Sequence, residues 1–490
     1  MTVMRMRIAL LIVVLCGMTS AVPAQKTQTD SEVQQHIKDV VAGLMPSVVA
    51  QGDAHATHTL SERMAEWHVP GVSVAVIHHG QIEWAQGFGV ASVGGFAVGA
   101  ETVFQAGSIS KPVAAMAALK LVQDGKLKLD ADVNTELTSW KLPDAPVAAG
   151  KPVTLRMLLT HTGGTTVHGF PGYAAGEAVP TLVQVLNGEK PANTAAIRIE
   201  AAPGTKWNYS GGGFTIMQLM VVDVTKEPFP KVMHDTVLKP IGMKHSTYEQ
   251  PLPAEMRAMA ATPYDGKGNA VEGGAHTYPE MAAAGLWTTP SDLCLYLMEV
   301  QESLKGKANH VLNQTMTKEM LTPGMGKWGL GLQIGGADAD PYFGHGGVNA
   351  GFESMMEAYE KDGEGAVVMT NAQGGSRLAD EVMRSVAKVY GWPDFQAKVR
   401  TAVKVDPKIL ETYVGTYELR PNFAINVLVK DGQMFTQATG QREVPMLAAS
   451  ETRFFPADFD AEIEFVKDAD GKVSSIVLRQ GGQEMKGARK

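Results

Sequence analysis

The 490-residue sequence predicts a mixed α/β (α+β) fold, in which one antiparallel sheet carries a helical subdomain and a small all-β unit follows. Two observations support the sheet. Strand-like alternation occurs over about residues 69–92 and again over about residues 328–374, so distant parts of the chain close one sheet around a helical middle. A third observation concerns the C-terminal part, where short alternating runs joined by Asp-Gly turns predict an all-β, barrel-like unit.

The first 24 residues are predicted to be a signal peptide. A short basic start, MTVMRMR, precedes the apolar run IALLIVVLCGM and the small-residue end TSAVPAQ, a pattern typical of an export signal cleaved after Ala24. A membrane anchor is the alternative, but the run is shorter than the roughly 20 residues of a spanning helix. We therefore expect a bacterial protein of the periplasm or the medium, with no stable membrane anchor after cleavage.

Charge and cysteine content narrow the class of protein further. Removing residues 1–24 takes away two arginines and no acidic residue, which leaves 41 basic and 51 acidic residues and a net charge of −10. Such a chain offers nothing basic for a nucleic acid to hold. Cys16 lies in the signal and Cys294 in the apolar stretch DLCLYLMEV, so we expect no intramolecular disulfide and a buried Cys294 thiol.

Between the signal and the C-terminus the pattern divides the chain into three parts. Residues 25–57 form a polar lead-in with a helix expected only near residues 40–49. Residues 58–395 form the main domain, which begins with a β-hairpin turning at His79-Gly80. Residues 405–490 form the all-β domain, with turns at Asp431-Gly432 and Asp470-Gly471.

One stretch of the main domain, VFQAGSISKPVAAMAALKLVQDGK, combines a turn with the start of a helix. Gly107 permits the turn, and Pro112 suits the first helical turn. Ser108 is thus predicted near a helix N-terminus, whose free N–H groups would stabilise an oxyanion. Lys111, three residues on, lies on the same face and within reach of the serine oxygen. A desolvated lysine there could act as a base.

Ser-x-x-Lys alone is weak evidence, because a chain of this composition contains it about once by chance. A second copy, Ser385-Val386-Ala387-Lys388, lacks the glycine turn and is expected on the solvated side of an amphipathic helix.

Two further segments distinguish the first copy. The turn-rich PGTKWNYSGGGF presents Tyr209, and YFGHGGVNAGF places His345 ahead of two glycines on a predicted strand. Glycines at 346 and 347 would let a substrate approach closely, and the N–H of Val348 could be a second oxyanion donor.

In order and spacing, Ser108-x-x-Lys111, Tyr209 and His345-x-Gly347 resemble the three signatures of the serine β-lactamase and penicillin-binding-protein superfamily. The resemblance covers about residues 58–392, including VTLRMLLTHTGG and AAAGLWTTPSDLCLY, and implies a β-lactamase/transpeptidase-like fold. The tyrosine in the middle signature looks like class C β-lactamases, DD-peptidases and related esterases and D-aminopeptidases. The C-terminal part is similar to the lipocalin-like domains attached to some of these hydrolases.

The resemblance also implies roles for the site residues. Ser108 would be the acylated nucleophile, Lys111 and Tyr209 would share the acid and base work, and His345 would stand where relatives have Lys or His. The N–H groups of Ser108 and Val348 would form the oxyanion hole, beside Gly346 and Gly347 in the substrate-binding strand.

Two departures concern the substrate. Gly211 replaces an amide side chain of many relatives, and His-Gly-Gly replaces Lys-Thr-Gly. Both changes fall on groups that in relatives contact the substrate amide and carboxylate, which argues against efficient β-lactam hydrolysis.

Metal catalysis is the competing prediction. Only Asp53-x-His55-x-x-His58 and His78-His79 invite it, and no His-Glu-x-x-His occurs, so no metal and no other cofactor is expected. His161, in LLTHTGG, is interpreted as a hydrogen-bonded scaffold residue.

The sequence thus predicts an exported serine hydrolase of the DD-peptidase, D-aminopeptidase or esterase type, acting on small-molecule or peptide substrates, including those derived from cell wall. The alternatives are a class C-like β-lactamase and a slow-turnover penicillin-binding sensor.

Overall fold

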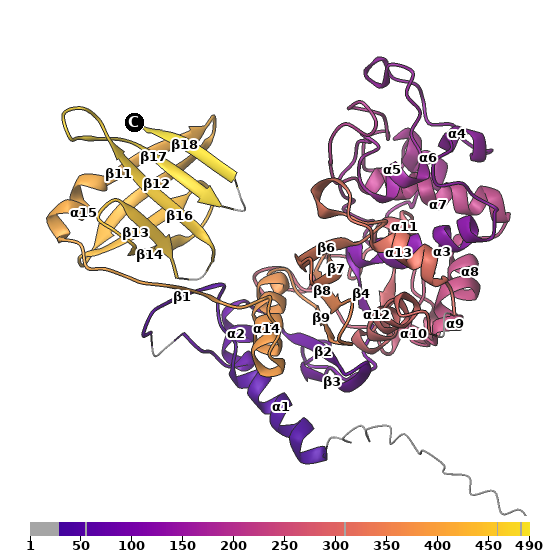
Figure 1. Ribbon diagram of the computed structural model, residues 1–490, viewed down its shortest axis with the longest axis horizontal. Helices are drawn as coiled ribbons and strands as arrows, with labels where there is room; N and C mark the ends of the chain where they lie inside the picture. The colour runs from indigo at the N-terminus through magenta and orange to yellow at the C-terminus, as the bar shows by residue number, and fades with distance from the viewer. Residues whose placement is uncertain (1–28, 54–55, 308–309, 458, 481–482) are drawn as a thin grey trace, which may run out of the picture.

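The computed structural model describes residues 29–490 except 54–55, 308–309, 458 and 481–482, so the predicted signal peptide lies outside the described residues. Its main domain is built on a six-stranded antiparallel sheet (Figure 1). The strand order is β3-β2-β9-β8-β7-β6. Their bounds are β2 Gly71–His78, β3 Gln81–Gly89, β6 Gln333–Ala337, β7 Asp340–Asn349, β8 Phe352–Tyr359 and β9 Gly365–Thr370.

Pairing between β2 and β9 confirms the prediction that distant parts of the chain close one sheet. Val72 faces Thr370 and Ile77 faces Gly365 across this pair. The alternating side chains of β2 enter two different cores, with Val74 on one face and Ala75 on the other. The hairpin between β2 and β3 turns at His79-Gly80, as predicted.

Helices cover both faces of this sheet and form the helical subdomain beside it. Helix α14 (Gly375–Tyr390) packs on β8 and β9, and α12 (Pro290–Leu304) packs on β2 and β9. The other helices of the main domain are α2 Leu60–Glu66, α3 Ser110–Gln123, α4 Val133–Glu136, α5 Leu155–Leu159, α6 Leu182–Asn187, α7 Gly211–Thr225, α8 Phe229–Met233, α9 Lys239–Ile241, α10 Ala254–Arg257, α11 Met281–Ala284 and α13 Gln314–Leu321. Two short strands, β4 (Phe104–Gln105) and β5 (Trp287–Thr288), pair with each other.

The lead-in segment is more ordered than its sequence predicts. Helix α1 (Asp30–Ala42) begins at a capping box formed by Thr29 and Glu32 and packs on α14. The helix expected near residues 40–49 is wrong: Gly43 caps the end of α1, and β1 (Val48–Ala50) follows. Strand β1 pairs in parallel with β10 (Lys398–Arg400), which leads to the C-terminal domain.

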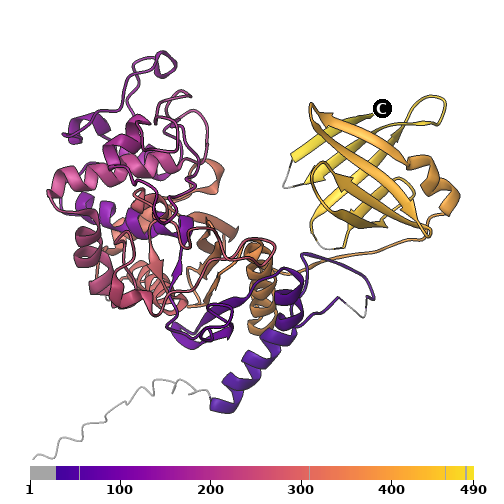
Figure 2. The same ribbon diagram turned by 180° about the vertical axis from the view of Figure 1, so that it is seen from behind.

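The C-terminal domain is a closed antiparallel barrel of eight strands, each paired with its neighbours in sequence. This is the up-and-down arrangement of lipocalins and confirms the barrel-like prediction. Helix α15 (Pro407–Tyr413) precedes the strands β11 Gly415–Arg420, β12 Phe423–Lys430, β13 Gln433–Ala438, β14 Glu443–Ala448, β15 Arg453–Pro456, β16 Ala461–Lys467, β17 Val473–Gln480 and β18 Gln483–Arg489. Figures 1 and 2 place the barrel and the helical subdomain at opposite ends of the molecule.

Within the described part of the chain, none of the helices combines the length and apolar character needed to cross a bilayer.

Candidate active site

Ser108 lies in a single 3₁₀ turn, η1 (Gly107–Ile109), between β4 and helix α3. Gly107 has a φ of +53°, and a Cβ atom there would lie 2.5 Å from the backbone nitrogen of Val348. Glycine is therefore required both by the backbone conformation and by the neighbouring strand. The second serine of the tetrad closes the turn, because the Ser110 hydroxyl donates to the Gly107 carbonyl at 2.6 Å.

Lys111 occupies the first turn of α3 and is 2% exposed. Its Nζ donates to Ser108 Oγ at 2.9 Å and to the carbonyl of Ala283 at 2.8 Å. The ammonium also lies 5.0 Å from the ring centre of Tyr209. Burial lowers the pKa of Lys111 to about 7, so a large share of the amine is neutral at physiological pH. A neutral amine in contact with the serine hydroxyl can accept its proton.

Tyr209 comes from the loop just before α7. Ser210 caps α7 by accepting from the N–H of Gly213, which fixes the backbone next to the tyrosine. Burial raises the pKa of the Tyr209 phenol, and a hydrogen bond with the Ser108 side chain acts in the opposite direction. The phenol is therefore protonated at neutral pH and positioned to exchange a proton with Ser108.

Strand β7 packs directly against the serine turn. A Cβ atom at Gly347 would lie 1.9 Å from the carbonyl oxygen of Ala106. Gly347 thus lets β7 pack closely against Ala106. This packing is a second reason for a glycine at this position, besides the close approach of a substrate that the sequence suggested. Gly346 and Val348 are exposed on the same strand, Val348 by 61%. The backbone nitrogen of Val348 lies beside Gly107, the residue before Ser108.

His345 lies on β7 with its ring buried in the site. Its Nδ1–H donates to the carbonyl of Gly346, and its Nε2 has no hydrogen-bond partner among the described residues. Burial, together with the charge of Lys111, lowers the pKa of His345 to about 3. The imidazole is neutral at physiological pH, and its Nε2 is a buried hydrogen-bond acceptor without a partner among the described residues.

His161 belongs to the same cluster, which its sequence context did not indicate. The scaffold role is supported, since His161 Nδ1 accepts from the backbone N–H of Ser210 at 3.1 Å. Its ring lies 4.3 Å from Tyr209 and 5.1 Å from Trp328, measured between ring centres. Trp328 in turn lies 5.4 Å from His345. The sequence did not indicate that these rings come together as an aromatic wall of the site.

The second Ser-x-x-Lys tetrad lies on α14, away from this cluster. The expectation that it faces solvent is wrong for Ser385, which is buried and donates to the carbonyl of Val40 in α1 at 2.7 Å. The sequence did not indicate this contact because the docking of α1 on α14 was not predicted. Lys388 is exposed.

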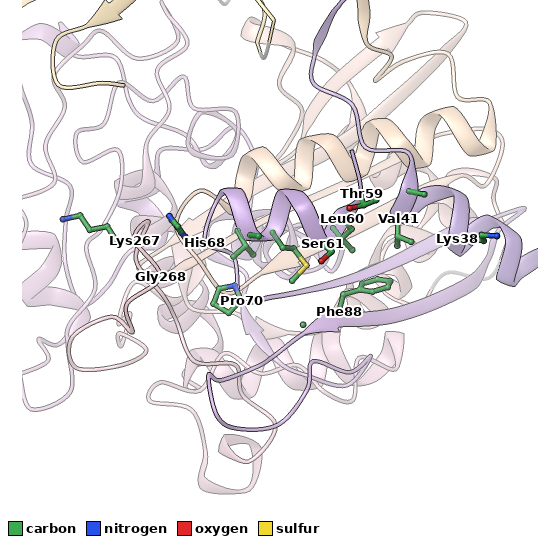
Figure 3. Close-up of a pocket in the computed structure, with 15 residues that line it drawn as sticks. Lys38, Val41, Thr59, Leu60, Ser61, His68, Pro70, Phe88, Lys267 and Gly268 are labelled. Atoms are coloured by element: carbon green, nitrogen blue, oxygen red, sulfur yellow. The ribbon is translucent and has the colours of Figure 1, made fainter. Parts of the chain in front are cut away.

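A cavity of about 870 Å³ lies elsewhere (Figure 3). It is lined from α1, α2, β3 and the loop around Lys267, and contains none of the predicted site residues. Buried Cys294, as expected, lies in a hydrophobic core of the main domain. His55, a member of the Asp53-x-His55-x-x-His58 pattern, lies outside the described residues.

A six-stranded antiparallel sheet with a helical subdomain is the fold of penicillin-binding-protein homologues. The solved octameric homologue from Pyrococcus abyssi aligns with a TM-score of 0.61 at 23% identity, covering 87% of this chain and 98% of that one. The D-amino acid amidase of Ochrobactrum anthropi aligns with a TM-score of 0.54 at 20% identity, covering 73% and 99%.

Sequence profiles then define the family. The Beta-lactamase profile matches residues 56–390, and the profile of a domain of unknown function, DUF3471, matches residues 399–489. The chain belongs to the Beta-lactamase family, with the eight-stranded barrel in the DUF3471 region. It is 26% identical over 323 residues to protein flp of Staphylococcus aureus, covering 62% of this chain and 60% of flp. The chain therefore spans less than two thirds of the length of that relative.

Proposed function

We propose that the protein is an exported serine hydrolase that acts through an acyl-enzyme on Ser108, with peptides, amides or esters as substrates. The observation that carries this proposal is the 2.9 Å contact between Ser108 Oγ and the buried Lys111 amine. Export to the periplasm or the medium rests on the signal-like pattern of residues 1–24 alone.

Acylation begins when neutral Lys111 takes the proton of Ser108 and the serine oxygen attacks the substrate carbonyl carbon. The negative charge on the carbonyl oxygen is stabilised by the N–H groups of Ser108 and Val348. The tetrahedral intermediate collapses, the bond to the leaving amine or alcohol breaks, and Tyr209 gives the leaving group a proton that Lys111 replaces. Water then attacks the acyl carbon by the reverse proton path and releases the acid and free Ser108.

The preferred substrate follows from the departures at His345 and Gly211. Neutral His345 carries no positive charge, so a substrate carboxylate gains little from it. A Cβ atom at residue 211 would lie 2.9 Å from the ring of Phe170, so the packing leaves no room for an amide side chain at this position unless Phe170 moves. We therefore expect uncharged amides and esters to be better substrates than carboxylate-bearing β-lactams. Since the Ochrobactrum anthropi neighbour is a D-amino acid amidase, D-amino-acid amides are the first amides to test.

A substrate panel tests the proposal. Steady-state kinetics are measured with an activated ester, a D-amino-acid amide, a peptide ending in D-alanine and a chromogenic cephalosporin. We expect turnover of the ester and the amide, loss of more than about 10³-fold in Ser108→Ala, and unchanged activity in the matched control Ser385→Ala.

Other outcomes identify the alternatives. Fast turnover of the cephalosporin alone would indicate a class C-like β-lactamase. A stable penicillin adduct without turnover of any substrate would indicate a sensor. Activity retained in Ser108→Ala would contradict the proposed nucleophile.

A further inference from the structure

We infer that His78, His79 and Glu364 form a binding site for a divalent transition-metal ion, with Zn²⁺ as the ion that the ligand set favours. One ligand atom from each of the three side chains lies within 4.8 Å of the other two, and the described residues contain no other such group of three. The site lies where β2 ends and β9 begins, at the edge of the sheet where β8 ends. The turn that carries Ser108 packs against Gly347 and Val348 of β7, which lie beside the start of β8 at the other edge. It is thus separate from the proposed active site.

The two histidines converge because of the hairpin turn. Successive side chains in a strand point to opposite faces, so adjacent histidines ordinarily diverge. Here His79 has a φ of +52° and Gly80 a φ of +75°, the backbone of a tight two-residue turn. The turn brings the rings of His78 and His79 to 3.8 Å between centres with an interplanar angle of 30°. Two imidazoles are thereby presented side by side.

Glu364 comes from a distant part of the chain, and hydrogen bonds hold its carboxylate in place. The N–H of Gly80 donates to the carbonyl of Gly363 at 2.8 Å, which ties the β2–β3 turn to the β8–β9 turn. The carboxylate accepts from the indole of Trp392 at 3.3 Å and from the backbone N–H of His79 at 3.1 Å. A carboxylate has about four lone-pair positions, so these contacts fix it and leave capacity for a metal.

The distances suit a small ion. Glu364 Oε1 lies 2.8 Å from His78 Nδ1 and 3.7 Å from His79 Nδ1. Metal–ligand bonds of about 2.0–2.2 Å in tetrahedral geometry separate ligand atoms by about 3.4 Å, between these two values. Binding requires His78 Nδ1 to give up the hydrogen bond to Glu364 and present its lone pair. Two imidazoles and one carboxylate, with water completing the shell, form a typical zinc ligand set.

Simple ion pairing does not account for this arrangement. The pair His310 and Glu299 shows the ordinary case, in which one imidazole meets one carboxylate at 2.7 Å. At Glu364 a second ring is added that is 69% exposed and too far from the carboxylate for a hydrogen bond. A cation shared by both rings and the carboxylate gives His79 a ligand role.

Isothermal titration of ZnCl₂ into the untagged, chelator-treated full-length protein tests the site. We expect one Zn²⁺ per chain, and a loss of affinity of more than about tenfold in His79→Ala and in Glu364→Gln. His310→Ala, which removes the matched His–Glu pair, should leave binding unchanged. The His79 side chain is 69% exposed, thermal unfolding checks that His79→Ala folds like the wild type, and Co²⁺ absorption with imidazole ligation should disappear in that variant. Absence of binding, or binding of equal strength in His79→Ala, would overturn the inference.

Discussion

The Lys111 amine, which we propose as the catalytic base, lies between a serine hydroxyl, a backbone carbonyl and aromatic rings. Two acceptors hold the nitrogen in place, and the rings of Tyr209 and Phe214 exclude water from it. Desolvation disfavours the ammonium form, which lowers the pKa of this lysine. A base whose pKa matches the pH of its surroundings is the most effective one.

This pKa predicts the pH dependence of acylation. Because the neutral amine is the base, kcat/KM for an uncharged ester should rise about tenfold per pH unit below pH 7 and level off above it, with a midpoint of about 7. Stopped-flow or steady-state assays from pH 5 to 9 measure this pH dependence of kcat/KM, with the spontaneous hydrolysis of the ester as the control. A midpoint near 10 would mean that Lys111 is not desolvated, and a flat profile would exclude it as the base.

At the scale of elements, the site depends on the contact between β7 and the turn η1. Asn349, at the end of β7, donates to Gln105 of β4 and to the carbonyl of Ala284 in α11, both at 3.0 Å. These bonds hold the strand against β4, which leads into the Ser108 turn, and against α11, which carries the carbonyl of Ala283 that accepts from Lys111. The backbone N–H groups of Ser108 and Val348, which we propose as the oxyanion donors, would thus be held by packing before any substrate binds.

Two glycine-to-alanine substitutions test whether β7 packs closely against the turn η1. In Gly107→Ala the new Cβ meets the Val348 backbone in a left-handed conformation, so we expect Tm to fall by at least about 2 °C and acylation to slow about 100-fold. Gly346→Ala meets no atom closer than 3.8 Å and should keep the wild-type Tm. Thermal unfolding and acylation rates measure both. Equal Tm values in the two variants would show that β7 and η1 are not tightly packed.

The sequence predicted the elements that local patterns specify, and failed where tertiary contacts decide. Gly107, Pro112 and the apolar spacing were enough to place the start of α3. Ser385 was misplaced, since only the docking of α1 makes it buried. The aromatic wall around Tyr209 was missed because His161 and Trp328 come from separate segments of the chain with no fixed spacing.

At the scale of the whole molecule, the barrel has a core of its own. Phe465 stacks on Tyr413 at 4.1 Å between ring centres, and its neighbours in this core all come from residues beyond 404. The connection to the main domain runs through β1 and β10, with ion pairs from Lys398 and Arg400 to Asp460. Exposed ion pairs contribute at most about 1 kcal/mol each, so the barrel should unfold independently of the main domain.

Calorimetry of the full-length protein tests this independence. Phe465→Ala removes a buried aromatic ring at a cost of about 3–5 kcal/mol, and should lower one of two thermal transitions by more than about 10 °C. Met217→Ala, in a core of the main domain, should lower the other. A single transition that both variants shift would mean that the domains unfold together.

The most direct test of the central claim is the location of the acyl group. The protein is mixed with an activated ester, quenched in acid, and analysed by intact mass and by peptide mapping. We predict one acyl group per chain, on the peptide that contains Ser108, and none in Ser108→Ala. An acyl group on another residue, or an adduct that persists in Ser108→Ala, would contradict the assignment of Ser108 as the nucleophile.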